Sequence, residues 1–110
     1  MTAGEIKTAL NLKCLTGEAG LSNEVSGGYT GDLLSWVMAN AQEKNVWITV
    51  QGHMNSIAVA SLSGISCIIM AENSLPEEDA IKKAAEEGIP VFSTEKPSYI
   101  IIKELISLDI

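Results

Sequence analysis

The sequence predicts an α/β fold with a mainly parallel sheet, helices on both faces and repeated strand–helix units. Short runs of β-branched and other apolar residues alternate with amphipathic helical segments, which is the pattern of α/β domains. The units recur about every 20–24 residues, a spacing that suits compact strand–helix modules. The run at 67–70 is continuously apolar, as expected for a parallel strand that is covered on both faces.

The length and the charge of the chain limit its class. A chain of 110 residues, 46% of them hydrophobic, predicts one folded domain over residues 1–110. The 14 acidic and 7 basic residues give a formal net charge of −7, which argues against nucleic acid or an anionic membrane as the main partner. We see no signal peptide, and the longest apolar run is far shorter than the roughly 20 residues of a spanning helix, so we expect a cytoplasmic protein.

The two cysteines do not indicate a metal or a cofactor. Cys14 and Cys67 have neither the spacing of a zinc site nor the number of ligands that an iron–sulfur cluster needs. Cys67 lies in an apolar run and is interpreted as a small buried side chain. Cys14 follows Lys13, and a reactive thiol there is the alternative. We therefore expect no metal site and no cofactor.

The first predicted elements are a helix, a short strand and a loop. Thr2 and Glu5 have the spacing of a capping box, and turn-spaced apolar residues follow, so we predict a helix over about residues 3–11. Residues 13–15 are interpreted as a short strand. The small and polar residues 16–23 predict a loop.

Four strand–helix units are predicted to follow. In the first, a strand at 24–26 leads to a glycine turn at 27–29 and then to a helix from Thr30 to about Ala41. The later strands are predicted at 46–50, 67–70 and 91–93, and the later helices at 55–63, 76–87 and 97–107.

The helix at 76–87 carries the most signals. Ser74 and Glu77 form a second capping-box pattern, with Pro76 near the first helical position. Gly88 stands where a helix ends in a left-handed residue. The acidic residues 77–79 suit the positive end of the helix dipole, so we interpret them as a helix start rather than as a metal site.

A ligand site is predicted where the carboxyl ends of the parallel strands meet, because open α/β sheets bind ligands at that edge. Two glycines and a helix start suit a small anionic ligand, although neither the P-loop nor the dinucleotide-binding pattern is present. The alternative is that the glycines form a tight turn and Thr30 caps the next helix. The candidate ligand-binding residues are Gly27, Gly28, Thr30, Asp32, Gln51, His53 and Asn55.

The only histidine is the candidate for acid–base chemistry. An imidazole ring can both donate and accept a proton, so His53 suits a general acid or base. The alternative is a helix-start residue that is hydrogen-bonded to backbone. Ser26 or Ser56 could complete a triad with His53 and Asp32, but no G-x-S-x-G motif supports nucleophilic catalysis. No catalytic residue is assigned.

The chain resembles the stand-alone DRTGG-type domains of bacteria. The resemblance is carried by residues 25–35, 47–55, 68–72 and 84–94, and it covers about residues 5–108. The second half is also similar to the N-terminal domain of HPr kinase/phosphorylase. The literal DRTGG string and the kinase P-loop are both absent, so the resemblance implies no kinase activity.

The resemblance implies a regulatory α/β domain that commonly forms oligomers. We therefore expect a non-catalytic regulatory or ligand-binding module that self-associates as a homodimer. One alternative is an adaptor that docks on a larger redox or hydrogenase-type enzyme through an apolar face with Trp36 or Trp47, because similar proteins are carried beside redox genes. Another is a small enzyme that uses His53 with Asp32.

Overall fold

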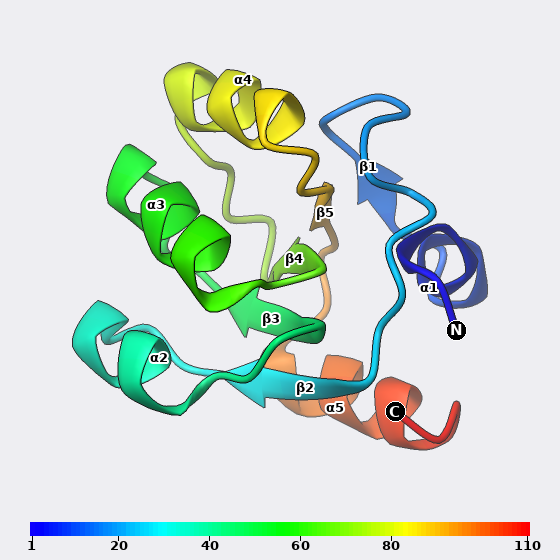
Figure 1. The fold of residues 1–110 in the computed structure, drawn as a ribbon. Coiled ribbons are helices and arrows are strands. Elements are labelled where there is room, and N and C mark those ends of the chain that lie inside the picture. The colour runs from blue at the N-terminus through cyan, green and yellow to red at the C-terminus, as the bar shows by residue number, and fades with distance from the viewer.

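The computed structural model describes residues 1–110 as a five-stranded sheet between two layers of helices (Figure 1). The strand order is β1-β5-β4-β3-β2, in which β1 is antiparallel to β5 and all other neighbours are parallel. The strands are β1 Lys13–Cys14, β2 Gly27–Thr30, β3 Asn45–Thr49, β4 Cys67–Met70 and β5 Val91–Ser93. The helices are α1 Ala3–Ala9, α2 Leu34–Asn40, α3 Met54–Ser63, α4 Glu78–Glu86 and α5 Ser98–Ile106.

The helices cover both faces of the sheet, which confirms the predicted fold class. Side chains of α1 and α5, such as Ile6 and Ile101, share one apolar cluster with Ile48 of β3. Side chains of α2, α3 and α4 form the second cluster around Trp47, on the other face. All five residues of β3 are buried, because neighbouring strand residues point to opposite faces and both faces are covered. No helix has the length and the apolar character needed to cross a bilayer.

The capping box at the first helix is confirmed. Thr2 Oγ1 accepts a hydrogen bond from the Glu5 amide, and the Glu5 carboxylate accepts one from the Thr2 amide. These two bonds pair donors that would otherwise be unsatisfied at the start of α1. The bond from the Thr2 amide also holds the pKa of the Glu5 carboxyl below its usual value, because it favours the ionised carboxylate.

The second predicted capping box is wrong. Helix α4 begins at Glu78, and its N-cap residue Glu77 makes no side-chain capping bond. The Ser74 hydroxyl instead donates to the Ala71 carbonyl oxygen at 2.6 Å, since the chain turns sharply after β4. Buried Pro76 therefore lies before the helix rather than in its first turn. The predicted end is confirmed, because Gly88 follows the helix with φ +70°.

The first strand–helix unit is also displaced from its prediction. The strand is Gly27–Thr30, so the glycines predicted as a turn pair in parallel with Asn45 and Val46 of β3. Residues 24–26 lie before that strand, and Glu24 forms only an isolated bridge with Thr2. Thr30 does not cap a helix, because α2 begins at Leu34. A strand with two glycines is tolerated here because β2 is the edge of the sheet.

Candidate functional site

A hydrogen-bonded network joins the segments that leave the carboxyl ends of β2 and β3. Asp32 Oδ1 accepts from the Thr49 hydroxyl at 2.7 Å and from the Val50 amide at 3.0 Å. Gln51 Nε2 donates to the Asp32 carbonyl oxygen at 3.0 Å. His53 Nε2 lies 3.2 Å from Gln51 Oε1, and because an amide oxygen only accepts, the ring nitrogen donates. The network thus places Asp32, Gln51 and His53 together, as the sequence predicts.

The network ends at a helix start with free donors. His53 is the N-cap residue of α3 but makes no side-chain capping bond. The amides of Met54 and Asn55, at the start of the helix, have no hydrogen-bond partner in the protein. The expected bond from His53 to backbone is therefore wrong, since the ring bonds the Gln51 side chain instead. These amides and the helix dipole favour an anion, whereas the Asp32 carboxylate favours a hydroxyl or a cation.

The two glycines do not belong to this network. Gly27 and Gly28 lie at the beginning of β2, whereas Asp32 follows its carboxyl end. Thr30 is the last residue of the strand, and its hydroxyl donates to the Ile48 carbonyl oxygen at 3.3 Å. The alternative prediction, a tight glycine turn with Thr30 as a helix cap, is wrong, because these residues form the strand itself and α2 begins at Leu34.

Neither proposed triad is assembled. The Ser26 hydroxyl donates to the Glu43 carbonyl oxygen, near the opposite end of β2. The Ser56 hydroxyl is buried within α3 and has no hydrogen-bond partner. Neither serine contacts His53 through a hydrogen bond, so no serine is activated as a nucleophile.

The loops after β4 and β5 lie at the same edge of the sheet, as expected for parallel strands. The Asn73 amide donates to the Thr94 carbonyl oxygen, and the Glu72 amide donates to that of Lys96. Glu72 and Asn73 have φ values of +55° and +58°, which brings their amides onto the neighbouring loop. No group of three or more His, Cys, Asp or Glu side chains lies where it could hold a metal ion.

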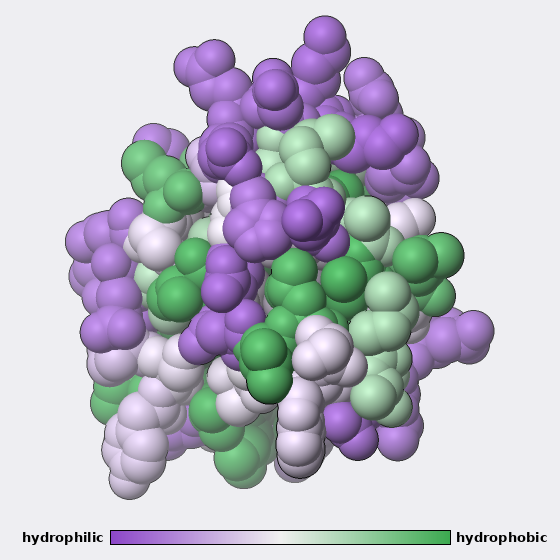
Figure 2. Space-filling view, turned by 90° about the vertical axis from the view of Figure 1, so that its left-hand side faces the viewer, coloured by the Kyte–Doolittle hydropathy of each residue, from purple (hydrophilic) through white to green (hydrophobic).

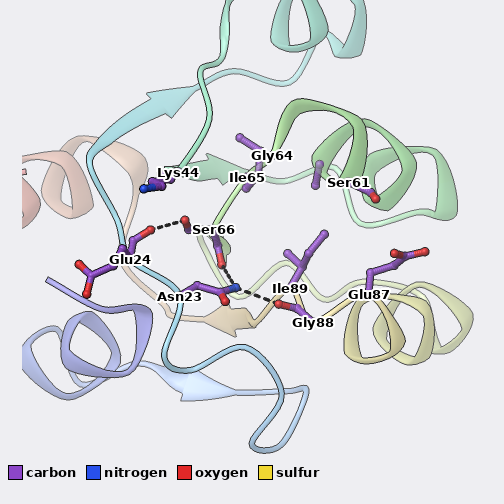
Figure 3. A pocket seen from close by; sticks show the side chains of 11 residues that line it. Asn23, Glu24, Lys44, Ser61, Gly64, Ile65, Ser66, Glu87, Gly88 and Ile89 are labelled. Atoms are coloured by element: carbon purple, nitrogen blue, oxygen red, sulfur yellow. Dashed lines mark hydrogen bonds between the residues drawn. The ribbon is translucent and has the colours of Figure 1, made fainter.

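A polar pocket of about 350 Å³ lies at the opposite edge of the sheet, where the strands begin (Figure 3). Asn23 crosses this edge and donates from Nδ2 to the Ser66 and Gly88 carbonyl oxygens, at 3.1 and 2.9 Å. The carboxyl ends of α3 and α4, at Gly64 and Glu87, form the other wall. The sequence does not reveal this pocket, because its lining comes from five separate segments of the chain.

An apolar pocket of about 220 Å³ lies between β2 and α5. Gly28 and Thr30 line it from the strand, and Ile102 and Ile106 line it from the helix. Two candidate ligand residues, Gly28 and Thr30, therefore line a pocket. This pocket is apolar, whereas the network of Asp32, Gln51 and His53 is polar. The missing side chain of Gly28 contributes to this space, because a Cβ there would meet nothing closer than Val46 Cγ1 at 3.4 Å.

The two tryptophans have opposite environments. Trp47 is fully buried, and its Nε1 donates to the Gly31 carbonyl oxygen at 2.9 Å. Docking through Trp47 is therefore wrong, because the side chain is part of the core. Trp36 on α2 is 63% exposed and is accessible to a partner.

The cysteines should differ in reactivity. Cys67 is fully buried, as predicted, and burial raises the pKa of its thiol to about 12 because the thiolate is poorly solvated there. Half-buried Cys14 should react alone with a thiol reagent in the native protein at pH 8, and both should react in guanidinium chloride. Counting released chromophore checks this expectation. If both thiols react at the same rate in native buffer, the expectation is contradicted.

Comparison with solved structures gives a fold match over almost the whole chain. The similar structure is that of the CBS and DRTGG domains of the regulatory region of Clostridium perfringens pyrophosphatase, complexed with its activator, diadenosine tetraphosphate. The TM-score is 0.69 at 13% sequence identity, and the match covers 96% of this chain. It covers 46% of the other chain, so this chain spans about half the length of that relative. Among curated proteins, none matches significantly.

The family is shown by the sequence itself. The model of the DRTGG domain family matches residues 5–108, a range that begins within α1 and includes all five strands and the helices α2 to α5. The expected resemblance is thereby confirmed, without the literal DRTGG string in the sequence. The chain belongs to the DRTGG domain family.

Proposed function

We propose that this chain is a non-catalytic regulatory module that binds a small anionic ligand and self-associates. The observation that carries the ligand site is the network of Asp32, Gln51 and His53 beside the uncapped start of α3. Membership of the DRTGG family and the likeness to a regulatory region support the regulatory role. Similarity to the N-terminal domain of HPr kinase/phosphorylase stays a prediction.

The chemistry of the network favours a ligand with both an anionic group and a hydroxyl group. The free amides of Met54 and Asn55 suit a phosphate or carboxylate, because they are donors at the positive end of a helix dipole. Both bonds to the Asp32 carboxylate fall on Oδ1, so Oδ2 is available to accept from a sugar hydroxyl. A nucleotide or a sugar phosphate carries both groups. The Clostridium perfringens relative is complexed with a nucleotide of this class, in a chain that also has CBS domains.

Isothermal titration calorimetry with a defined panel tests the ligand proposal. The panel contains inorganic phosphate, ribose 5-phosphate, AMP, ATP and diadenosine tetraphosphate. We expect binding of at least one sugar-containing member. Gln51→Ala should weaken it about tenfold, because the variant loses hydrogen bonds that position both Asp32 and His53.

Gln42→Ala is the matched control, since Gln42 is exposed and its side chain makes no hydrogen bond. Its affinity should equal that of the wild type. No heat of binding across the panel, or equal losses in both variants, would contradict the proposed site.

Self-association is proposed as a homodimer. Ten large hydrophobic side chains are exposed in the single chain, among them Trp36 and Leu62. An apolar surface of this kind is typical of an interface, because tryptophan, methionine and leucine gain free energy when a partner removes them from water.

A further inference from the structure

The exposed apolar side chains gather on the outer side of α2 and α3. Figure 2 shows this side of the molecule, with hydrophobic groups in its middle, hydrophilic groups among them, and the hydrophilic surface of α4 above. The exposed fractions range from 43% for Met54 to 76% for Leu62. We define the α2–α3 face by Leu33, Trp36, Met38, Met54 and Leu62.

The two helices that form this face carry no charged side chain of their own. Neither α2 nor α3 contains an Asp, Glu, Lys or Arg, whereas α1, α4 and α5 each carry both signs. The whole stretch between Lys44 and Glu72 lacks these residues, although the chain has 21 of them. Surface helices normally carry charges on their solvent side, so two neighbouring helices without any indicate a side that is not left in water.

Helix α2 is weakly held by its own chain. It has seven residues, of which only Val37 is buried and Leu34 half-buried. A helix of this length is not stable alone, and its stability depends on tertiary packing. Its largest side chain, Trp36, points away from that packing and is 63% exposed. A partner on this side would supply the missing contacts.

We infer that the α2–α3 face is the interface between two copies of this chain. This inference rests on the proposed self-association and assigns it a surface. Each copy has a net charge of −7, and acidic groups placed opposite each other in an interface repel, so we expect two copies to meet where the surface carries no charge. The α2–α3 face is such a surface, because its two helices offer no charged group to a partner that would be recognised by complementary charge, and Lys83 and Glu87 of α4 lie only at its border. A twofold axis would pack α2 and α3 against the same helices of the second copy.

Sedimentation equilibrium of the whole chain between 0.5 and 100 μM tests the inference. We expect a mass of twice 11.7 kDa at the upper end of this range. Trp36→Glu and Leu62→Glu should each weaken association about 30-fold or more, because each places a charge in an apolar interface at a large anchoring side chain. Salt at 500 mM should strengthen wild-type association relative to 50 mM, since it screens the repulsion between two acidic copies.

Tyr99→Glu is the control, because Tyr99 is 80% exposed on α5, which covers the other face of the sheet. It should remain a dimer. Dimers that persist in both Trp36→Glu and Leu62→Glu would overturn the surface but leave self-association intact. A wild type that is monomeric at 100 μM would overturn both, without bearing on ligand binding.

If a variant fails to fold, the tryptophan fluorescence of the wild-type protein tests the interface independently. Acrylamide should quench wild-type fluorescence less at 100 μM than at 0.5 μM, because dimerisation covers Trp36 while Trp47 is buried at every concentration. Quenching that does not change while the mass doubles would place the interface elsewhere and overturn the inference.

Discussion

Gly20→Ala is expected to lower the free energy of unfolding by about 3 kcal/mol or more. Gly20 has φ +74°, a conformation that alanine adopts only with strain. In addition, a Cβ there would overlap the Gly88 carbonyl oxygen and lie 2.7 Å from Pro90 Cδ. The loop before β2 passes so close to the start of β5 that only glycine fits. Urea unfolding followed by circular dichroism measures the change.

Gly17→Ala separates the two causes. Gly17 lies in the same loop with φ +71°, but a Cβ there would meet no atom within 4 Å. Its substitution should therefore cost only the conformational strain, about 1 kcal/mol. Equal losses at the two positions would show that the close approach to Gly88 contributes nothing.

Trp47→Ala is expected to cost about 4 kcal/mol of unfolding free energy. Trp47 is fully buried at the centre of the cluster between the sheet and α2, α3 and α4, so truncation leaves a large cavity. The Gly31 carbonyl oxygen also loses its donor, the indole Nε1. Trp47→Phe should cost less, about 2 kcal/mol, because it keeps a six-membered aromatic ring and loses only the pyrrole part of the indole with its hydrogen bond.

Trp36→Ala is the comparison for this prediction. Measured in dilute solution, where copies are separate, it should change the unfolding free energy by less than about 1 kcal/mol, since Trp36 is mostly exposed. Losses of similar size for the two tryptophans would contradict the assigned environments.

The fold class followed from the sequence because the buried strands have an unambiguous pattern. Strands such as β4 are continuously apolar, because helices cover both faces of the sheet and bury every side chain of the strand. The prediction of the first strand–helix unit was wrong because its strand contains two glycines, which normally indicate a turn. At an edge strand the cost of glycine is small, and the order of the strands is not visible in a single sequence.

The candidate site was predicted where topology alone determines position. Asp32, Gln51 and His53 follow the carboxyl ends of neighbouring parallel strands, so they had to lie at one edge. Thr49 was missed because it lies inside a strand, where a hydroxyl is usually interpreted as core or surface filling. Asn23 was missed because its partners are carbonyl oxygens, and backbone groups leave no signature in the identity of Ser66 or Gly88.

The side chain of Gln51 has a consequence for how binding and assembly depend on each other. Its amide bonds the segment that leads into α2 through Asp32, and it bonds the N-cap of α3 through His53. With a ligand at the network and a second copy on the α2–α3 face, both events act on the same pair of helix starts. Thermodynamic linkage then requires reciprocity: a ligand that tightens the dimer binds more tightly as the protein concentration rises, by the same factor.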